Sequence, residues 1–192
     1  AMTAMQLADM GHESVSLNGA QAGIRTDNIH GDAHILDIDT GRILRELNAG
    51  RIVVVAGFQG IGGNGDTTTL GRGGSDTTAV ELAAALNADR CEIYSDVDGI
   101  YTADPRLVTG TLRLECIDYC DMLALALHGS QVLHSRSVEA AMRSGVRVHL
   151  LSSFTRREGT VMGAFPDRPS MCGVTRDSQL STVSIIGRSA GA

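Results

Sequence analysis

Short strand-like runs that alternate with helical segments are the feature that most constrains how this 192-residue chain can fold. Strand spacing is seen at 14–17, 33–38, 52–55, 91–94 and 146–150, and helical spacing at 2–10, 40–50, 76–86, 118–127 and 135–144. Strands and helices in alternation predict an α/β sandwich around a mainly parallel sheet. The run at 52–55 is β-branched throughout, which predicts a strand buried on both faces, and Thr40 is expected to cap the helix that precedes it.

The composition excludes several classes of function. Hydrophobic residues make up 43% of the chain but aromatic residues only 3%, so the core must consist of Ala, Val, Ile and Leu. The net charge of −6 argues against nucleic acid as a partner, because its phosphates would be repelled. No apolar run approaches the ~18 residues of a membrane span. The four cysteines lack disulfide or zinc spacing, which favours reduced thiols and a cytoplasmic location.

All 16 basic residues are arginine, and the sequence contains no lysine. A P-loop requires a lysine on the phosphates and a Schiff-base enzyme requires an amine, so this chain alone can build neither. The segment 60–65 matches the G-x-G-x-x-G spacing of dinucleotide-binding proteins, but residues 66–70 do not open a helix. Because no helix amino end is then available for a pyrophosphate, we interpret this segment as a glycine-rich turn between two strands.

Two long, polar, glycine-bearing loops, 57–75 and 95–106, each follow a predicted strand. Ligands of α/β proteins bind beyond the carboxyl ends of strands, so we place the site in these loops. In the first loop Arg72 stands between glycines, and its planar guanidinium suits a carboxylate or a phosphate. Ser75 and Asp76 follow at the amino end of the next helix, where the dipole favours negative charge. We favour an anion site; the alternative is an ordinary loop in which Ser75 or Asp76 caps the helix.

The second loop holds three carboxylates, a tyrosine and an arginine. Asp96, Asp98 and Asp104 could together reach a divalent metal, although their spacing fits no EF-hand. Tyr101 could lie along a nucleotide base, and Arg106 could meet phosphates. The alternative, a surface loop rich in Pro, Gly and Asp, is left open by the spacing.

At these two loops the sequence resembles aspartate kinase, a family with the amino-acid kinase fold. The resemblance is carried by 55–60, 67–79 and 93–106, with further support at 21–23, 30–31 and 132–134. It implies a three-layer sandwich in which residues 1–163 are the central and C-terminal part of the catalytic domain. Residues 164–192 are expected to be a linker and the start of a truncated ACT-like region, with two short strands within 172–186. The first residue is alanine, so we expect the sequence to be N-terminally truncated, beginning part-way through a larger protein.

The resemblance also implies roles for individual residues. Arg72, Gly73, Gly74 and Ser75 would bind the amino-acid substrate, and Asp76 matches the catalytic aspartate that organises cationic groups around the transferred phosphoryl. The residues implied in nucleotide binding are Ser95, Asp96, Tyr101, Thr102, Ala103, Asp104, Pro105, Arg106 and Gln131. ATP would carry Mg²⁺ on its phosphates, and no residue of the chain is assigned as a metal ligand.

The implied reaction converts L-aspartate and ATP to 4-phospho-L-aspartate and ADP, the first step of lysine, threonine and methionine biosynthesis. The family's Lys-Phe-Gly-Gly loop and Thr-Gly-Glu segment are absent from this sequence, and Gln131 stands where the family has a nucleotide-site lysine. We therefore expect weak or no kinase activity from this chain. The alternative is a non-catalytic nucleotide- or amino-acid-binding module, a regulatory partner of an intact kinase. The expected partners are small molecules, with no nucleic acid and no membrane; self-association and association with an intact kinase subunit both stay open.

Overall fold

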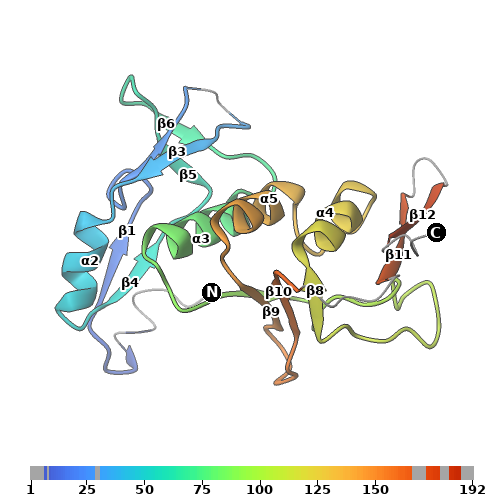
Figure 1. Ribbon diagram of the computed structural model, residues 1–192. Helices are drawn as coiled ribbons and strands as arrows, with labels where there is room; N and C mark the ends of the chain where they lie inside the picture. Colours follow the sequence, from blue (N-terminus) through green and yellow to red (C-terminus); the bar gives the residue numbers. More distant parts are fainter. Residues whose placement is uncertain (1–6, 8, 29–30, 166–171, 178–181, 187–192) are drawn as a thin grey trace. The chain divides into compact units, whose positions relative to one another are not determined.

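The computed structural model describes residues 7, 9–28, 31–165, 172–177 and 182–186 (Figure 1). The chain divides into two compact units, residues 1–87 and 88–192, and each is described by itself. Most of the helix predicted at 2–10 lies outside the described residues, although Leu7 and Asp9 are helical. No helix among the described residues is long and apolar enough to cross a membrane.

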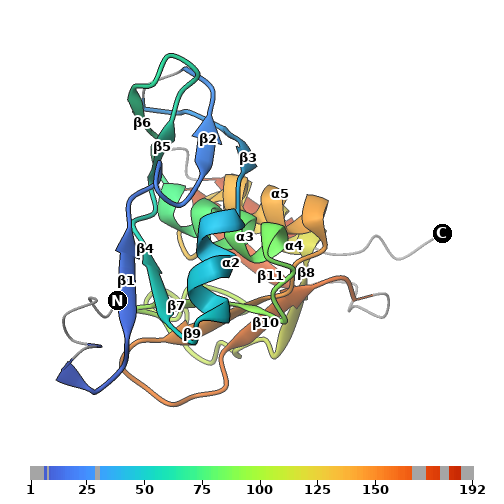
Figure 2. The same cartoon turned by 90° about the vertical axis from the view of Figure 1, so that its left-hand side faces the viewer.

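The first unit contains two sheets and two helices. One sheet pairs β1 (Ser14–Leu17) with β4 (Ile52–Val55) in parallel. The other has the order β3-β2-β5-β6, formed by Ile35–Ile38, Ile24–Thr26, Gln59–Ile61 and Thr67–Thr69. Its β2·β5 pair is parallel and its outer pairs are antiparallel. Helix α2 (Gly41–Asn48) packs against β4 (Figure 2), and α3 is Gly74–Ala85.

The core of the first unit joins both sheets to both helices. Leu17, Ala22, Ile24 and Ile43 are buried at its centre, and aliphatic side chains of β1, β3, β4 and the end of α3 pack around them. Full burial of each of the three larger side chains, Leu17, Ile24 and Ile43, contributes about 1.5–3 kcal/mol to folding. The loop that leaves β4 and the loop that enters α3 are therefore both anchored in one apolar core.

Two local expectations for this unit are wrong. Ile52 is 38% exposed and the rest of β4 is half-buried, because β4 pairs only with β1 among the described strands. Thr40 occupies the N-cap position of α2 without a side-chain cap, because its backbone already has helical angles. Instead, Asp39 Oδ1 accepts the Gly41 N–H at 3.0 Å.

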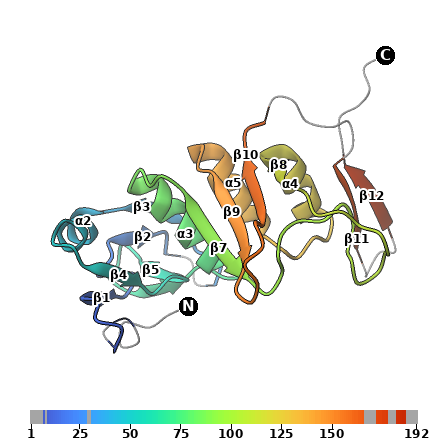
Figure 3. The same ribbon diagram turned by 90° about the horizontal axis from the view of Figure 1, so that it is seen from below.

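The second unit is built on a four-stranded sheet in the order β7-β9-β10-β8. The strands are Cys91–Ser95, Val148–Ser152, Thr160–Gly163 and Cys116–Asp118; β7·β9 and β10·β8 are parallel, and β9·β10 is antiparallel. Helices α4 (Tyr119–Leu127) and α5 (Ser135–Ser144) pack against each other on one side of this sheet (Figures 1 and 3). Strands β11 (Gly173–Asp177) and β12 (Thr182–Ile186) form an antiparallel hairpin that packs against α4.

The structure confirms the predicted α/β class, with parallel pairs in both units. It also confirms the turn at 60–65, which joins β5 to β6 as a hairpin. The two short strands expected within 172–186 are β11 and β12. Strands β2, β8 and β10 were not predicted from the sequence.

Candidate functional site

The Arg72 loop, residues 70–76, leads from β6 into α3. Gly73 has a left-handed backbone (φ 69°) at the N-cap position, and the helix begins at Gly74, two residues earlier than predicted. Ser75 and Asp76 therefore lie inside the first helical turn, and the alternative interpretation, in which one of them caps the helix, is wrong. Ser75 is exposed and Asp76 is half-buried, so both side chains are accessible at the amino end of α3.

Glycine is required at two positions of this loop. Gly71 has a φ of +71°, and a Cβ there would lie 2.1 Å from the Gly31 carbonyl oxygen. A Cβ on Gly74 would lie 2.7 Å from Leu70 Cβ and 2.9 Å from the Phe58 ring. All three distances are far below van der Waals contact, so the backbone is packed too closely for any side chain. The loop around Arg72 thus has a shape fixed by its glycines.

Arg72 itself is exposed, and its guanidinium has no hydrogen bond or ion pair with any residue that the structure describes. An arginine offers five N–H donors in a planar fork that matches a carboxylate or a phosphate. A cation on a glycine-fixed loop, beside the amino end of a helix, is suited to bind an anion.

Phe58 borders the Arg72 loop and was missed by the sequence reasoning. It has a φ of +71°, which is uncommon for a residue other than glycine, and it is 44% exposed. Its N–H is held by Thr78 Oγ1 at 3.2 Å, and its carbonyl accepts the Leu70 N–H at 2.9 Å. Strained backbone of this kind clusters at functional sites. The available signal was a lone aromatic residue in a glycine-rich loop that follows a strand.

The second loop, residues 95–106, begins at the carboxyl end of β7. Ser95 Oγ donates to Asp96 Oδ1 at 3.0 Å, and Asp96 is exposed. Thr102 donates its N–H to the Leu112 carbonyl at 2.9 Å and accepts the Leu112 N–H on Oγ1 at 3.1 Å. Tyr101 forms an isolated antiparallel bridge with Arg113. These bonds fold the second half of the loop back on residues 112–113.

Asp104, Pro105 and Arg106 form a turn closed by its own ion pair. Asp104 Oδ1 accepts the Arg106 N–H at 2.9 Å and the Nε–H at 3.0 Å, while Arg106 Nη2 donates to Oδ2 at 2.8 Å. The hydrogen bonds from the Arg106 side chain lower the pKa of Asp104, and they raise the pKa of Arg106. Ala103 is half-buried and Pro105 is exposed. The cation of this loop is thus already neutralised, unlike Arg72.

Asp98 is engaged by two partners. It accepts the Tyr101 hydroxyl at 2.9 Å on Oδ1 and Arg157 Nη1 at 2.7 Å on Oδ2. Burial raises the pKa of Asp98, but the hydrogen bonds from Tyr101 and Arg157 outweigh it, so the pKa lies below the usual range. Arg157 lies between β9 and β10 and was not among the expected site residues. Arg157 is 59 residues from Asp98 in the sequence, so no local sequence pattern could indicate this contact.

The three carboxylates of this loop do not form a metal cluster. Within the described ranges, no group of three or more His, Cys, Asp or Glu side chains could hold a metal ion. Asp98 and Asp104 instead pair with Arg157 and Arg106. The reading of Asp96, Asp98 and Asp104 as a shared metal site is therefore wrong.

Gln131 lies on a separate segment of the second unit, the connection between α4 and α5. It is exposed, and its side chain makes no hydrogen bond to a described residue. Strand β11 reaches the second loop directly, because the Val174 N–H donates to the Thr102 carbonyl at 2.8 Å. The residues predicted to bind the nucleotide thus come from two segments: the loop 95–106 and the connection between α4 and α5, which contains Gln131.

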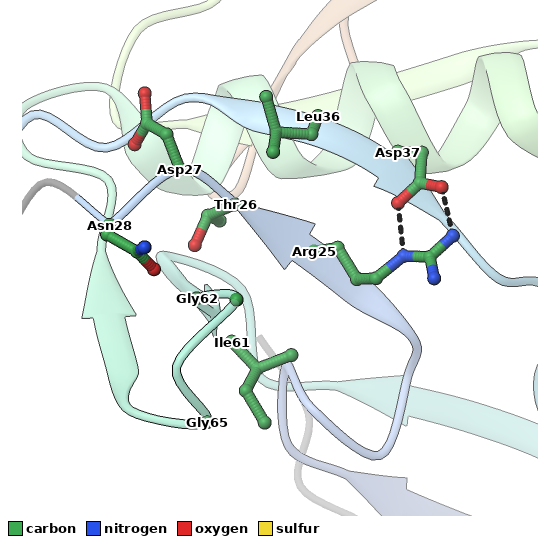
Figure 4. Close-up of a pocket in the computed structure, with 10 residues that line it drawn as sticks. Arg25, Thr26, Asp27, Asn28, Leu36, Asp37, Ile61, Gly62 and Gly65 are labelled. Carbon is green, nitrogen blue, oxygen red and sulfur yellow. Dashed lines mark hydrogen bonds and ion pairs between the residues drawn. The ribbon is translucent and has the colours of Figure 1, made fainter.

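A cavity of about 780 Å³ lies on the first unit, lined by β2, β3 and the β5–β6 turn (Figure 4). The ion pair between Arg25 and Asp37 lies along its wall, and Gly62 lies at the turn. None of the residues expected at the site lines this cavity. Its arginine is already paired, so it offers no unpaired cation comparable with Arg72.

Known proteins match both the sequence and the fold. Residues 1–152 match the amino acid kinase family. Aspartokinase of Bacillus sp. (strain MGA3) is 47% identical over 97% of this chain and 46% of its own length. Escherichia coli aspartokinase III, solved with aspartate and ADP, aligns with a TM-score of 0.80 at 33% identity, covering 88% of this chain and 39% of that one. Aspartate kinase from Synechocystis aligns with a TM-score of 0.70 at 44% identity, covering 86% of this chain and 27% of that one.

The chain spans about half the length of the curated relatives it matches. The family match, in contrast, covers well over half of this chain and includes both loops. This chain therefore belongs to the amino acid kinase family.

Proposed function

We propose that this chain is part of an aspartate kinase, which transfers the γ-phosphoryl group of ATP to the side-chain carboxylate of L-aspartate. The observation that carries the proposal is the guanidinium of Arg72 on its glycine-fixed loop, which has no partner among the described residues, in a chain 47% identical to an aspartokinase. Support also comes from aspartokinase III, whose structure contains aspartate and ADP. The products would be 4-phospho-L-aspartate and ADP, at the head of lysine, threonine and methionine synthesis in the cytoplasm.

In this proposal the Arg72 loop binds the amino acid. Arg72 forms a bidentate pair with a substrate carboxylate, while the amide of Gly73 and the hydroxyl of Ser75 donate to the same ligand. The Gly74 N–H already donates to the Gly71 carbonyl at 3.1 Å, so Gly74 would contribute by its close packing. A carboxylate with a pKa of ~4 is already ionised at neutral pH, so the reaction needs no general base. Asp76 would act by orienting cationic groups near the transferred phosphoryl. Catalysis then consists of positioning and of compensating negative charge.

The loop at 95–106 is proposed to bind ATP. Tyr101 would lie along the base, and Arg106 would contact the phosphates while it remains bonded to Asp104. Thr102, Ala103 and Pro105 would shape the backbone around the nucleotide. Mg²⁺ is normally held by phosphate oxygens with one or two carboxylates, and the exposed carboxylate of Asp96 fits that requirement. When bound, the ion would neutralise phosphate charge.

A second candidate is a binding module without catalysis. It is favoured by the absence of lysine from all 192 residues and by Gln131 at the position of a nucleotide-site lysine. Groups that stabilise developing negative charge are typically each worth about 2.7–4 kcal/mol in the barrier. The lack of one such cation at Gln131 would lower the rate by about two to three powers of ten.

We also propose that residues 1–163 form the kinase domain and that 164–192 begin an ACT-like regulatory region. The antiparallel β11–β12 hairpin supports this division. The hydrogen bond from the Val174 N–H to the Thr102 carbonyl would connect that region to the nucleotide loop.

The experiment is to incubate the chain with Mg·ATP, L-aspartate and hydroxylamine, and to measure aspartyl hydroxamate and ADP. A phosphotransferase yields the two in equal amounts and loses both on Asp76→Asn. A binding module shows saturable binding of L-aspartate and ATP by calorimetry but no hydroxamate. If saturable binding of L-aspartate or of ATP is absent, both candidate functions are overturned.

A further inference from the structure

The nucleotide loop is anchored at two points to the segment that forms β9 and β10. At its start, the Ser153 N–H donates to the Ser95 carbonyl at 2.8 Å. Farther along, Thr160 Oγ1 accepts the Ile100 N–H at 2.9 Å and donates to the Leu114 carbonyl at 2.6 Å. Residues 96–99 connect these two anchors, so their position depends on the side-chain contacts that they make.

Within residues 96–99, Asp98 provides such a contact through its carboxylate. Its two carboxylate oxygens have different donors: the Tyr101 hydroxyl at 2.9 Å and Arg157 Nη1 at 2.7 Å. Arg157 comes from the connection between β9 and β10, the same connection that carries Ser153. A single carboxylate therefore links the phenol of the nucleotide loop to the neighbouring strand connection.

The exposure of the two partners indicates that their ion pair orients side chains and adds little to folding stability. The Asp98 side chain is 17% exposed and that of Arg157 is 65% exposed. An ion pair with so exposed a cation contributes little to folding, so stabilisation of the fold does not explain this pair well. A hydrogen-bonded carboxylate with both oxygens occupied nevertheless fixes the direction of each donor.

The backbone beside Asp98 has little freedom to compensate. Gly99 has a φ of +141°, and a Cβ there would lie 2.6 Å from Thr160 Oγ1 and 3.0 Å from Arg113 Cδ. The chain is thus pressed against the start of β10. If Arg157 is removed, Asp98 can turn toward solvent by side-chain rotation, and the Tyr101 hydroxyl then loses its fixed acceptor.

We infer that Arg157 is a positioning residue for the nucleotide: through Asp98 it fixes the orientation of Tyr101, on which a purine nucleoside triphosphate is bound. This inference rests on the proposed function, because it assumes that loop 95–106 binds ATP. It adds a residue from outside that loop, which acts without touching the ligand.

The test compares Arg157→Ala with Arg156→Ala as the matched control. Arg156 is the adjacent arginine, is also exposed, and has no hydrogen bond or ion pair to a described residue. We expect Arg157→Ala to weaken Mg·ATP binding about fivefold, the typical net effect of one hydrogen bond, at an unchanged Tm. Arg156→Ala stays within about twofold, and Arg157→Lys restores binding because one ammonium donor can replace Nη1.

A double variant shows whether Arg157 acts through Tyr101. In a Tyr101→Phe background, Asp98 has no phenol to orient, so adding Arg157→Ala should weaken ATP binding no further. An additive loss would mean that Arg157 contacts the nucleotide itself and would overturn the positioning role. Equal ATP affinities of Arg157→Ala and Arg156→Ala would overturn the inference alone. Failure of the unaltered chain to bind ATP would overturn the proposed function, and this inference with it.

Discussion

The two loops resemble each other in composition but differ in how their charges are used. Arg72 has no partner within the described part of the chain, and glycines fix the backbone on both sides of it. In the loop at 95–106, Arg106 is bonded to Asp104, and Asp98 is bonded to Arg157. The first loop therefore needs a ligand to supply negative charge to Arg72. In the second loop Asp98, Asp104 and Arg106 are paired before any ligand arrives, and Asp96 keeps an exposed carboxylate. Ligand binding should depend strongly on one arginine in the first loop and be spread over several groups in the second.

The largest expected effect is that of Arg72→Ala on L-aspartate binding. Removal of a bidentate guanidinium–carboxylate pair takes away two charge-assisted hydrogen bonds, so we expect the Kd to rise about 100-fold. The Tm should not change, because Arg72 is exposed and unpaired among the described residues. Calorimetric titration and thermal unfolding measure the two quantities. Arg42→Ala, another exposed arginine of the first unit, is the control, and equal aspartate affinity in the two variants would refute the assignment.

A smaller effect is expected for Arg106→Ala on ATP binding. Part of the Arg106 charge is balanced by Asp104, so its loss should weaken ATP binding by about tenfold and leave aspartate binding unchanged. Asp104→Asn is the companion variant. If Asp104 serves only to hold Arg106, ATP affinity stays within about threefold. A loss as large as that of Arg106→Ala would show that Asp104 contacts the nucleotide directly.

Gln131→Lys should strengthen ATP binding. A lysine at this exposed position adds one solvent-screened cation near the phosphates, worth about 1 kcal/mol or about fivefold in Kd. The effect should shrink at high salt, because exposed charges are screened. ATP titrations at two ionic strengths measure it, with Gln131→Met as the uncharged control. No gain over that control would remove Gln131 from the nucleotide site.

The smallest expected effect concerns the ionisation of Tyr101. Burial, followed by the hydrogen bond to Asp98 and its charge, raises the pKa of Tyr101 above its usual value. Asp98→Asn should therefore lower this pKa. Because the folded-state pKa lies above the unfolded one, the stabilisation from this phenol is present at neutral pH and is lost as the pH rises through the folded-state pKa. Ultraviolet titration of tyrosinate measures the shift, and Tyr101→Phe identifies its transition among the three tyrosines.

Elements whose signal is local could be predicted from the sequence. Strands β1 and β4 have the predicted bounds, and α5 begins and ends where Ser135 and Gly145 indicated. Strands β2 and β10 could not be predicted, because each contains a threonine whose burial depends on distant partners. Thr26 bonds to Thr68, and Thr160 bonds to Ile100 and Leu114. Hydrophobic periodicity does not detect such residues, because a threonine is polar and its burial here depends on hydrogen bonds to residues distant in the sequence.

The same distinction applies to the candidate site. The two loops could be located from glycine and charge patterns, and the Asp104–Arg106 pair is close enough in sequence to be guessed. The link from Asp98 to Arg157 and the positive φ of Phe58 could not, because both depend on tertiary structure. The sequence thus predicts which loops bind ligands, whereas the structure shows which of their charged groups lack a partner among the described residues.

We expect the two loops to bind different ligands, and nuclear magnetic resonance of the ¹⁵N-labelled 20.1 kDa chain can follow each loop separately. We expect L-aspartate to shift the amide signals of residues 71–77 and to leave those of 95–106 unchanged. Mg·ATP should shift 95–106 and Gln131 and leave 71–77 unchanged. Shifts of the same loop by both ligands, or of neither loop by either, would contradict the account.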